Sequence, residues 1–187
     1  MTKLTMEQKP KRPRVTWANR ITIVRLLLTP VLIILLLKGE RLWPLYIFLL
    51  AALSDILDGA VARWRNEQTT LGKFLDPVAD KLLLSSSFLI LSLLGRTPLW
   101  VFIVVLFRDL LILIGWNVLF ILTRVARIEP RALGKATTFA QMATVIAMLT
   151  FPGQPWPKFL TIPMIVVTVL STIDYVWVGS QRLGELG

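Results

Sequence analysis

Residues 21–38 read ITIVRLLLTPVLIILLLK, an apolar run with a single charge, Arg25, in its interior. A helix needs roughly 20 apolar residues to cross a bilayer, so this run is long enough for one crossing. Five more runs of similar length follow, at about residues 43–62, 77–94, 98–123, 134–151 and 159–178. The sequence therefore predicts an all-α, polytopic membrane protein with six transmembrane helices.

The composition of the 187-residue chain agrees with this class and limits the chemistry. Hydrophobic residues make up 55% of the chain and charged residues 17%, whereas a soluble domain carries about a quarter charged residues. The chain has no Cys and no His, which excludes disulfides, thiolate metal sites and the commonest general base. Chemistry would rest on carboxylates, Lys, Arg and hydroxyl groups, and this donor set favours Mg²⁺ over zinc.

The 21 Lys and Arg residues are distributed unevenly around the predicted spans. Fifteen lie in or beside the segments that are cytoplasmic if the N-terminus is inside, four lie on the other side, and Arg25 and Arg108 lie within spans. The positive-inside rule then predicts that both termini face the cytoplasm. In this interpretation residues 1–20 form a short basic cytoplasmic arm and residues 21–187 a single domain. The net charge of +10 would suit nucleic acid, but the hydropathy excludes that partner.

Four carboxylates, Asp55, Asp58, Asp76 and Asp80, fall within 26 residues at the predicted cytoplasmic ends of the second and third spans. Spacings of three and four place each pair on one face of its helix, and the short connection would bring the two helices together. Packing gives no reason for so many acids beside a membrane, where they would repel one another. Two divalent cations, Mg²⁺ or Mn²⁺, would remove the repulsion and could clamp a pyrophosphate group.

The alternative roles for these acids are hydrogen bonding between helices and the lining of an ion path. Gly59 and Gly72 lie beside the acids and indicate close approach by a ligand or a neighbouring backbone. Arg63, one turn beyond Gly59, could neutralise phosphate oxygens or belong to the basic cytoplasmic flank. Pro77 is expected in the first turn of the third helix, with the positive end of that helix directed at the phosphates.

Written in full, the acidic segment is D55-I-L-D58-G59-A-V-A62-R63, eight further residues, and then G72-K-F-L-D76-P-V-A-D80. It resembles the signature of the CDP-alcohol phosphatidyltransferase family, D-x2-D-G-x2-A-R-x8-G-x3-D-x3-D, at every fixed position and every gap. The resemblance implies an integral membrane enzyme, a homodimer, that uses two divalent cations. Such an enzyme transfers a phosphatidyl group from CDP-diacylglycerol to an alcohol and releases CMP.

The resemblance also implies roles for individual residues. Asp55, Asp58 and Asp76 would be metal ligands, and Asp80 would be both a metal ligand and the general base. The residues that would shape the CDP pocket are Gly59, Ala62, Arg63 and Gly72.

Polar residues recur along one face of the first predicted helix. Asn19, Thr22 and Arg25 follow one another at three-residue steps, which resembles the opening of the phosphatidylglycerophosphate synthases of this family. By this resemblance Asn19 and Thr22 join the CDP pocket. Arg25 is costly inside an apolar run unless it meets an anion, so we expect it to face the site rather than to snorkel to the interface.

The identity of the alcohol depends on the remaining basic residues. Arg108 lies near the middle of the fourth span, and the cost of burying it predicts a place in the site. A salt bridge to Asp109 is the alternative, although adjacent helix residues point in different directions. Lys81 and the segment G134-K135-A-T-T138-F-A-Q141 also resemble the synthase pattern. The residues predicted to bind the acceptor's phosphate are Arg25, Lys81, Arg108, Arg131 and Lys135. This set favours glycerol 3-phosphate.

Two departures from the synthase pattern leave phosphatidylglycerol as the alternative acceptor. The synthases usually have Glu where this chain has Asp109, and Lys where it has Thr137. Arg followed by Asp resembles the CMP-forming cardiolipin synthases of the same family. Serine and inositol phosphate also stay open as acceptors.

An ion-coupled transporter is the alternative from another class, because transporters also place charges within spans. It would distribute polar residues along a path, whereas these acids cluster at one depth. We therefore expect a multi-pass enzyme with its site on the cytoplasmic side of a bacterial inner membrane or an equivalent membrane.

Overall fold

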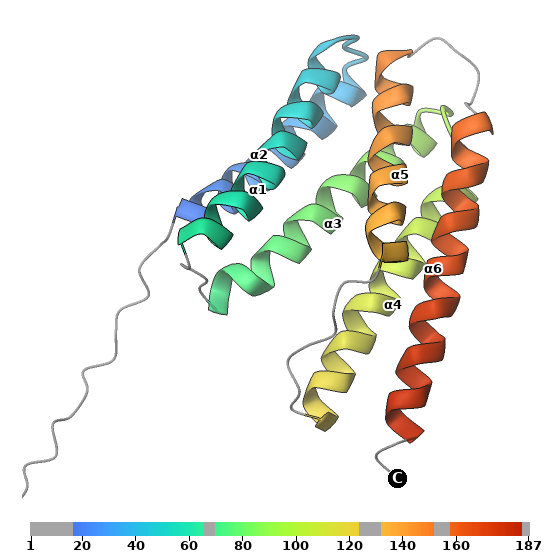
Figure 1. Cartoon of the computed structure of the whole chain (residues 1–187). Coiled ribbons are helices and arrows are strands. Elements are labelled where there is room, and N and C mark those ends of the chain that lie inside the picture. The colour runs from blue at the N-terminus through green and yellow to red at the C-terminus, as the bar shows by residue number, and fades with distance from the viewer. Residues whose placement is uncertain (1–16, 66–69, 124–131, 152–157, 185–187) are drawn as a thin grey trace, which may run out of the picture.

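The computed structural model describes residues 17–65, 70–123, 132–151 and 158–184, and the side chains of residues 22–54, 78–115, 132–151 and 158–181. Every regular element in these ranges is a helix (Figure 1). The helices are α1 (Trp17–Leu37), α2 (Trp43–Arg65), α3 (Thr70–Leu93), α4 (Leu99–Thr123), α5 (Ala132–Thr150) and α6 (Lys158–Gly184). The predicted all-α class is confirmed for this part of the chain. Residues 1–16, most of the predicted basic arm, lie outside it.

The helix boundaries follow the apolar runs closely except at the start of α3 and at the end of α6, which extends to Gly184 rather than residue 178. Hydropathy predicts a span from residue 77, whereas α3 begins at Thr70. The additional residues, TLGKFLD, are too polar to read as part of a span, yet they are helical. Pro77 therefore lies inside α3, and its expected place in the first helical turn was wrong. As a consequence, Asp76 and Asp80 belong to one continuous helix.

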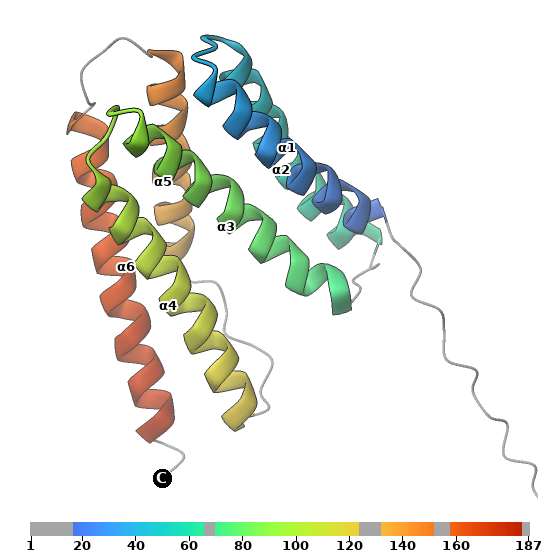
Figure 2. The same ribbon diagram turned by 180° about the vertical axis from the view of Figure 1, so that it is seen from behind.

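The helices form a bundle in which α1 packs against both α2 and α3, the two helices that carry the acidic segment. α4 packs against α3 and α6, while α5 packs against α6, α2 and α3. Figures 1 and 2 show the bundle from opposite sides, with α1 and α2 at one edge and α4 and α6 toward the other. α3 and α5 therefore connect the two edges.

Two glycine turns close the same end of the bundle, uppermost in Figure 1. Gly39 follows α1 with φ of 74°, and Gly95 follows α3 with φ of 71°. These left-handed conformations are costly for residues with a Cβ atom. In each turn the next N–H group, of Glu40 or Arg96, donates to a carbonyl five residues earlier, at 3.1 or 2.9 Å. This is the hydrogen bond that ends helices in a Schellman motif.

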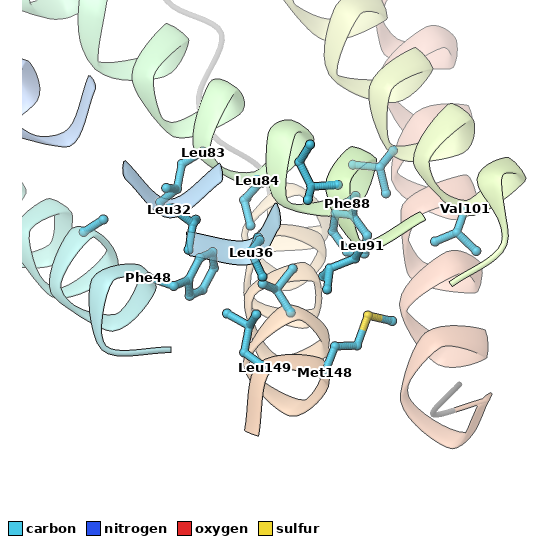
Figure 3. Close-up of a cluster of buried hydrophobic side chains, with 14 of the residues drawn as sticks. Leu32, Leu36, Phe48, Leu83, Leu84, Phe88, Leu91, Val101, Met148 and Leu149 are labelled. Atoms are coloured by element: carbon cyan, nitrogen blue, oxygen red, sulfur yellow. The ribbon is translucent and has the colours of Figure 1, made fainter. Parts of the chain in front are cut away.

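The buried residues of α1 form a single stripe with spacings of three and four. They are Thr22, Arg25, Thr29, Leu32 and Leu36. The first three are polar and the last two are apolar, so the stripe has a polar half and an apolar half. The apolar half packs into a core built by large side chains from other helices, among them Phe48, Leu84, Phe88, Met148 and Leu149 (Figure 3).

The exterior of the bundle is rich in large apolar side chains, whereas charged side chains lie inside. Phe139, Phe159 and Trp177 are 75%, 77% and 65% exposed. Arg25 and Arg108, in contrast, are only 1% and 3% exposed. Water-soluble proteins seldom show this distribution, and a lipid environment suits it.

Among the described residues, two helical stretches are long and apolar enough to cross a bilayer. They are Ala132–Thr150 and Lys158–Gln181. Shorter apolar helical stretches cover Thr22–Leu37 and Trp43–Ser54.

Leu91 and Leu93 provide a matched test of the core. Leu91 is fully buried in α3, whereas Leu93, two residues later on the same helix, is 67% exposed. Leu91→Ala leaves a cavity and removes packing contacts, so we expect a loss of roughly 2–5 kcal/mol and a lower melting temperature in detergent. Leu93→Ala removes the same atoms from the surface and should shift the melting temperature much less. Equal shifts would contradict the position of the core.

Candidate active site

Arg25 of α1 and Asp80 of α3 form an ion pair between Nη1 and Oδ1. Arg25 is buried, and the Asp80 side chain is 30% exposed. Thr22 and Thr29 lie one turn to either side of Arg25 on the buried face, and the Thr29 hydroxyl donates to the Arg25 carbonyl oxygen at 3.0 Å. The predicted common face of Thr22 and Arg25 is therefore confirmed, and Arg25 faces the interior rather than the interface.

Lys81, the residue after Asp80, pairs across the bundle with Asp109 of α4 through Nζ and Oδ1. The same Asp109 oxygen accepts a hydrogen bond from Arg108 Nη1 at 2.8 Å. Adjacent helix residues usually diverge, so the sequence favours a place in the site over an Arg108–Asp109 pair. The expectation that the two would not pair was wrong, because the long Arg108 side chain turns back to the carboxylate. Asp109 therefore joins two cations from two helices.

Arg108 also reaches the helices on the other side of α4. Its Nη2 lies 3.4 Å from the hydroxyl oxygen of Ser171 in α6. A methyl group placed on Gly134 of α5 would lie 3.6 Å from the same Nη2, so the α5 backbone passes directly over the guanidinium. Lys135, the next residue, has an exposed side chain. The charged cluster thus connects α1, α3, α4, α5 and α6.

The acidic segment is helical on both sides of its connection. Asp55 and Asp58 lie in α2, and Asp76 lies in α3 with Asp80. The side chains of Asp55, Asp58 and Asp76 are outside the described part, and so are those of the predicted CDP residues Asn19, Gly59, Ala62, Arg63 and Gly72. Arg131 lies outside the described residues altogether. Each pair of acids keeps the predicted helical spacing.

The donor set of the acidic segment suits a hard divalent cation, since it consists of carboxylate oxygens. Among the residues whose side chains are described, no group of three or more carboxylates could hold a metal ion. Asp80 is the described member of the predicted ligand set, and it is partly exposed at the edge of the buried cluster. A cation bound there would compete with Arg25 for this carboxylate.

The described charges nearly balance one another. The cluster contains three cations and two carboxylates: Arg25, Lys81 and Arg108 with Asp80 and Asp109. Lys81 and Arg108 share the single carboxylate of Asp109, so this trio carries one net positive charge. The cluster can therefore hold an anion beside Lys81 and Arg108, with the Asp80 carboxylate nearby as a proton acceptor.

Sequence reasoning missed three polar residues of this interior. Asp109 was considered only as an unfavoured neighbour of Arg108. Ser171 continues the buried stripe of α6 that includes Thr161, Met164 and Thr168, but its hydroxyl gave no signal by itself. Gln141 is fully buried, and neither atom of its amide has a hydrogen-bond partner among the described residues. The only sequence signal for Gln141 was its place in the segment that begins at Gly134.

Comparisons with known proteins identify the family of the chain. A family model for CDP-alcohol phosphatidyltransferases matches residues 15–174. The chain is 34% identical over 181 residues to a probable phosphatidylglycerophosphate synthase of Mycobacterium tuberculosis, covering 91% of this chain and 83% of that protein. It is 31% identical to the CDP-diacylglycerol–glycerol-3-phosphate 3-phosphatidyltransferase of Aquifex aeolicus, over 88% of this chain and 96% of that protein. It is also 34% identical to a CMP-forming cardiolipin synthase of Streptomyces coelicolor, over 75% of this chain and 68% of that protein.

Replacement of Arg25 tests whether its ion pair competes with a divalent cation for Asp80. Arg25→Gln removes the guanidinium from the Asp80 carboxylate, which should cost about 1–3 kcal/mol of stability in the presence of a chelator. Added Mg²⁺ should therefore raise the melting temperature of the variant more than that of the unmodified protein. Arg41→Gln, in the exposed α1–α2 turn, is the control. If Mg²⁺ shifts all three proteins equally, Arg25 does not compete with the cation for Asp80.

Proposed function

Because the chain belongs to the CDP-alcohol phosphatidyltransferase family, we propose that it transfers the phosphatidyl group of CDP-diacylglycerol to glycerol 3-phosphate and releases CMP. The family match and the relatives of both M. tuberculosis and A. aeolicus support this reaction. The observation that carries the proposal is the buried Lys81–Asp109–Arg108 cluster, which begins one residue after Asp80. It supplies cations for a phosphorylated acceptor beside a candidate base.

The proposed chemistry is a direct displacement. The acceptor hydroxyl loses its proton to Asp80 while its oxygen attacks the phosphatidyl phosphorus, and the bond from that phosphorus to the oxygen of CMP breaks. Asp55, Asp58, Asp76 and Asp80 would hold two divalent cations, most simply Mg²⁺ or Mn²⁺, which supply charge neutralisation to the pyrophosphate when bound.

We assign CDP binding to the start of α1 and to the α2–α3 segment. The residues are Asn19, Thr22, Gly59, Ala62, Arg63 and Gly72. Thr22 is fully buried one turn before Arg25, which supports its direction toward the site. The guanidinium of Arg63 would balance phosphate charge, while the glycines would let the nucleotide approach the backbone.

We assign binding of the acceptor's phosphate to the basic residues that lie outside the proposed CDP site. The residues are Arg25, Lys81, Arg108, Arg131 and Lys135. Lys81 and Arg108 are the best supported, because their charges lie inside the bundle. Lys135 is exposed and follows Gly134, so it would reach an acceptor at the entrance rather than in the interior.

Phosphatidylglycerol is the second candidate acceptor, which would make the protein a CMP-forming cardiolipin synthase. Asp109 favours this alternative, because its buried carboxylate offsets one of the two cations that it contacts. A site with less positive charge suits the single charge of a phosphodiester better than the nearly two charges of a phosphomonoester. The similarity to the S. coelicolor protein also supports it.

We further propose that all six helices cross the membrane, with both termini and the active site on the cytoplasmic side. The family is membrane-embedded, and the apolar exterior of the bundle supports a lipid environment. The distribution of Lys and Arg supports the orientation. A bacterial inner membrane, or its equivalent, and a homodimer complete this proposal.

The measurement that tests the function is CMP release by purified protein with CDP-diacylglycerol, Mg²⁺ and one acceptor at a time. The acceptors are glycerol 3-phosphate, phosphatidylglycerol, inositol phosphate and serine. We expect release with glycerol 3-phosphate and its loss in excess chelator. Release with phosphatidylglycerol alone would establish the cardiolipin synthase alternative. No release with any acceptor would refute the proposed function.

Asp80→Asn tests the proposed base with little change in shape. The amide cannot accept the hydroxyl proton, so we expect CMP release to fall by at least about a hundredfold, while binding of CDP-diacylglycerol is largely retained. Glu40→Gln, in the exposed turn after α1, makes the same chemical change away from the site and should leave turnover unchanged. Near-normal turnover in Asp80→Asn would exclude this residue as the base.

A further inference from the structure

Asp109 holds a position in the cluster that the proposed function leaves unexplained. It is 2% exposed on α4, and one of its oxygens, Oδ1, receives both Lys81 Nζ and Arg108 Nη1. A carboxylate with two oxygens could bind each cation separately. By engaging both cations through a single oxygen, Asp109 leaves its second oxygen for another partner.

The second oxygen of Asp109 and the Nε atom of Arg108 lack hydrogen-bond partners among the described residues. Within the described part of the chain, neither Asp109 Oδ2 nor Arg108 Nε makes a hydrogen bond, although both are buried. Lys81, whose side chain is 20% exposed, uses one of its three N–H donors toward Asp109 and keeps two for a ligand or for solvent. Buried polar atoms of charged groups are normally satisfied, and leaving them unpaired is costly. These atoms therefore indicate a ligand that both accepts and donates hydrogen bonds.

The chemistry of the unpaired atoms defines that ligand. Arg108 Nε and the remaining Lys81 donors require an acceptor with negative charge, such as a phosphate oxygen. Asp109 Oδ2 requires a donor, and it lies on the same carboxylate that joins the two cations. A hydroxyl group close to a phosphate satisfies both requirements. A phosphorylated polyol such as glycerol 3-phosphate carries both groups, on adjacent carbon atoms.

We propose that Asp109 organises the acceptor subsite, and this inference rests on the proposed function. Through Oδ1 it positions Lys81 and Arg108 around one phosphate, and through Oδ2 it accepts a hydrogen bond from a hydroxyl of the acceptor that does not react. The site would thereby distinguish phosphorylated polyols from phosphorylated alcohols that have only the attacking hydroxyl. Ser171, at 3.4 Å from Arg108 Nη2, fixes the other end of the guanidinium.

The first test needs only the unmodified protein. 3-Hydroxypropyl phosphate keeps the phosphate and the reacting hydroxyl of glycerol 3-phosphate but lacks its middle hydroxyl. We expect kcat/KM for CMP release to fall about tenfold or more with this analogue, because Asp109 Oδ2 loses its donor. If phosphatidylglycerol is the acceptor, the corresponding analogue without the middle hydroxyl is phosphatidyl-1,3-propanediol. Equal use of the analogue and the parent acceptor would overturn the hydroxyl contact.

The second test combines the analogue with Asp109→Asn. The amide carries no charge to position the two cations, so the KM for the acceptor should rise about tenfold or more, while the KM for CDP-diacylglycerol changes less than about twofold. The penalty for the missing hydroxyl should also shrink in the variant, which a purely structural role of Asp109 would not produce. Asp109→Glu keeps the charge and should recover part of the acceptor affinity.

The outcomes separate this inference from the proposed function. If the unmodified protein releases CMP but Asp109→Asn changes both KM values equally and keeps the full hydroxyl penalty, Asp109 serves the fold only and the inference is wrong. If Asp109→Asn does not fold in detergent, the analogue on the unmodified protein still decides the hydroxyl contact. If the unmodified protein releases no CMP with any acceptor, the proposed function itself fails.

Discussion

Charge pairing inside an apolar bundle is the constraint on which the rest of this structure depends. Arg25 and Arg108 are buried and Lys81 is only 20% exposed, so each must meet a carboxylate or another polar group. Asp80 pairs with Arg25. Asp109 pairs with both Lys81 and Arg108. These contacts fix how α1 lies along α3 and how α3 lies along α4. The same ion pairs therefore set the register of the helices and build the site.

The same helices carry a packed apolar region at one end and the charged cluster at the other. On α1 the change occurs between Thr29 and Leu32, within one turn of the buried stripe. The apolar region has close side-chain packing from α1, α2, α3 and α5, and close packing resists small displacements. Because Arg25 and Asp80 extend from this region along continuous helices, their positions are set by packing that takes no part in the chemistry. A rigid support of this kind suits a site that must hold two charged substrates.

Hydropathy predicted the six helices well because each apolar run is about as long as a helix that crosses a bilayer. The start of α3 was wrong, since its first turns are polar and hydropathy reports only the apolar part of a helix. Sequence spacing also placed Thr22 and Arg25 on one face, where the structure confirms them. It could not find the role of Asp109, because adjacent helix positions diverge locally and the pairing depends on the length of the Arg108 side chain and on Lys81 from another helix. Local periodicity predicts faces, whereas contacts between distant segments need the tertiary arrangement.

The choice between the two acceptors follows from the charge around Asp109 rather than from the fold. Lys81 and Arg108 alone would present two positive charges to a phosphate, which matches a phosphomonoester, but the Asp109 carboxylate between them removes one. Further positive charge would then have to come from a residue such as Lys135, which is exposed on α5. A small soluble phosphomonoester would need that additional charge. A phosphodiester within a lipid needs only the interior charges, because its single charge is balanced there. In this chain the charged groups around the Asp109 carboxylate would therefore decide which of the two acceptors is used.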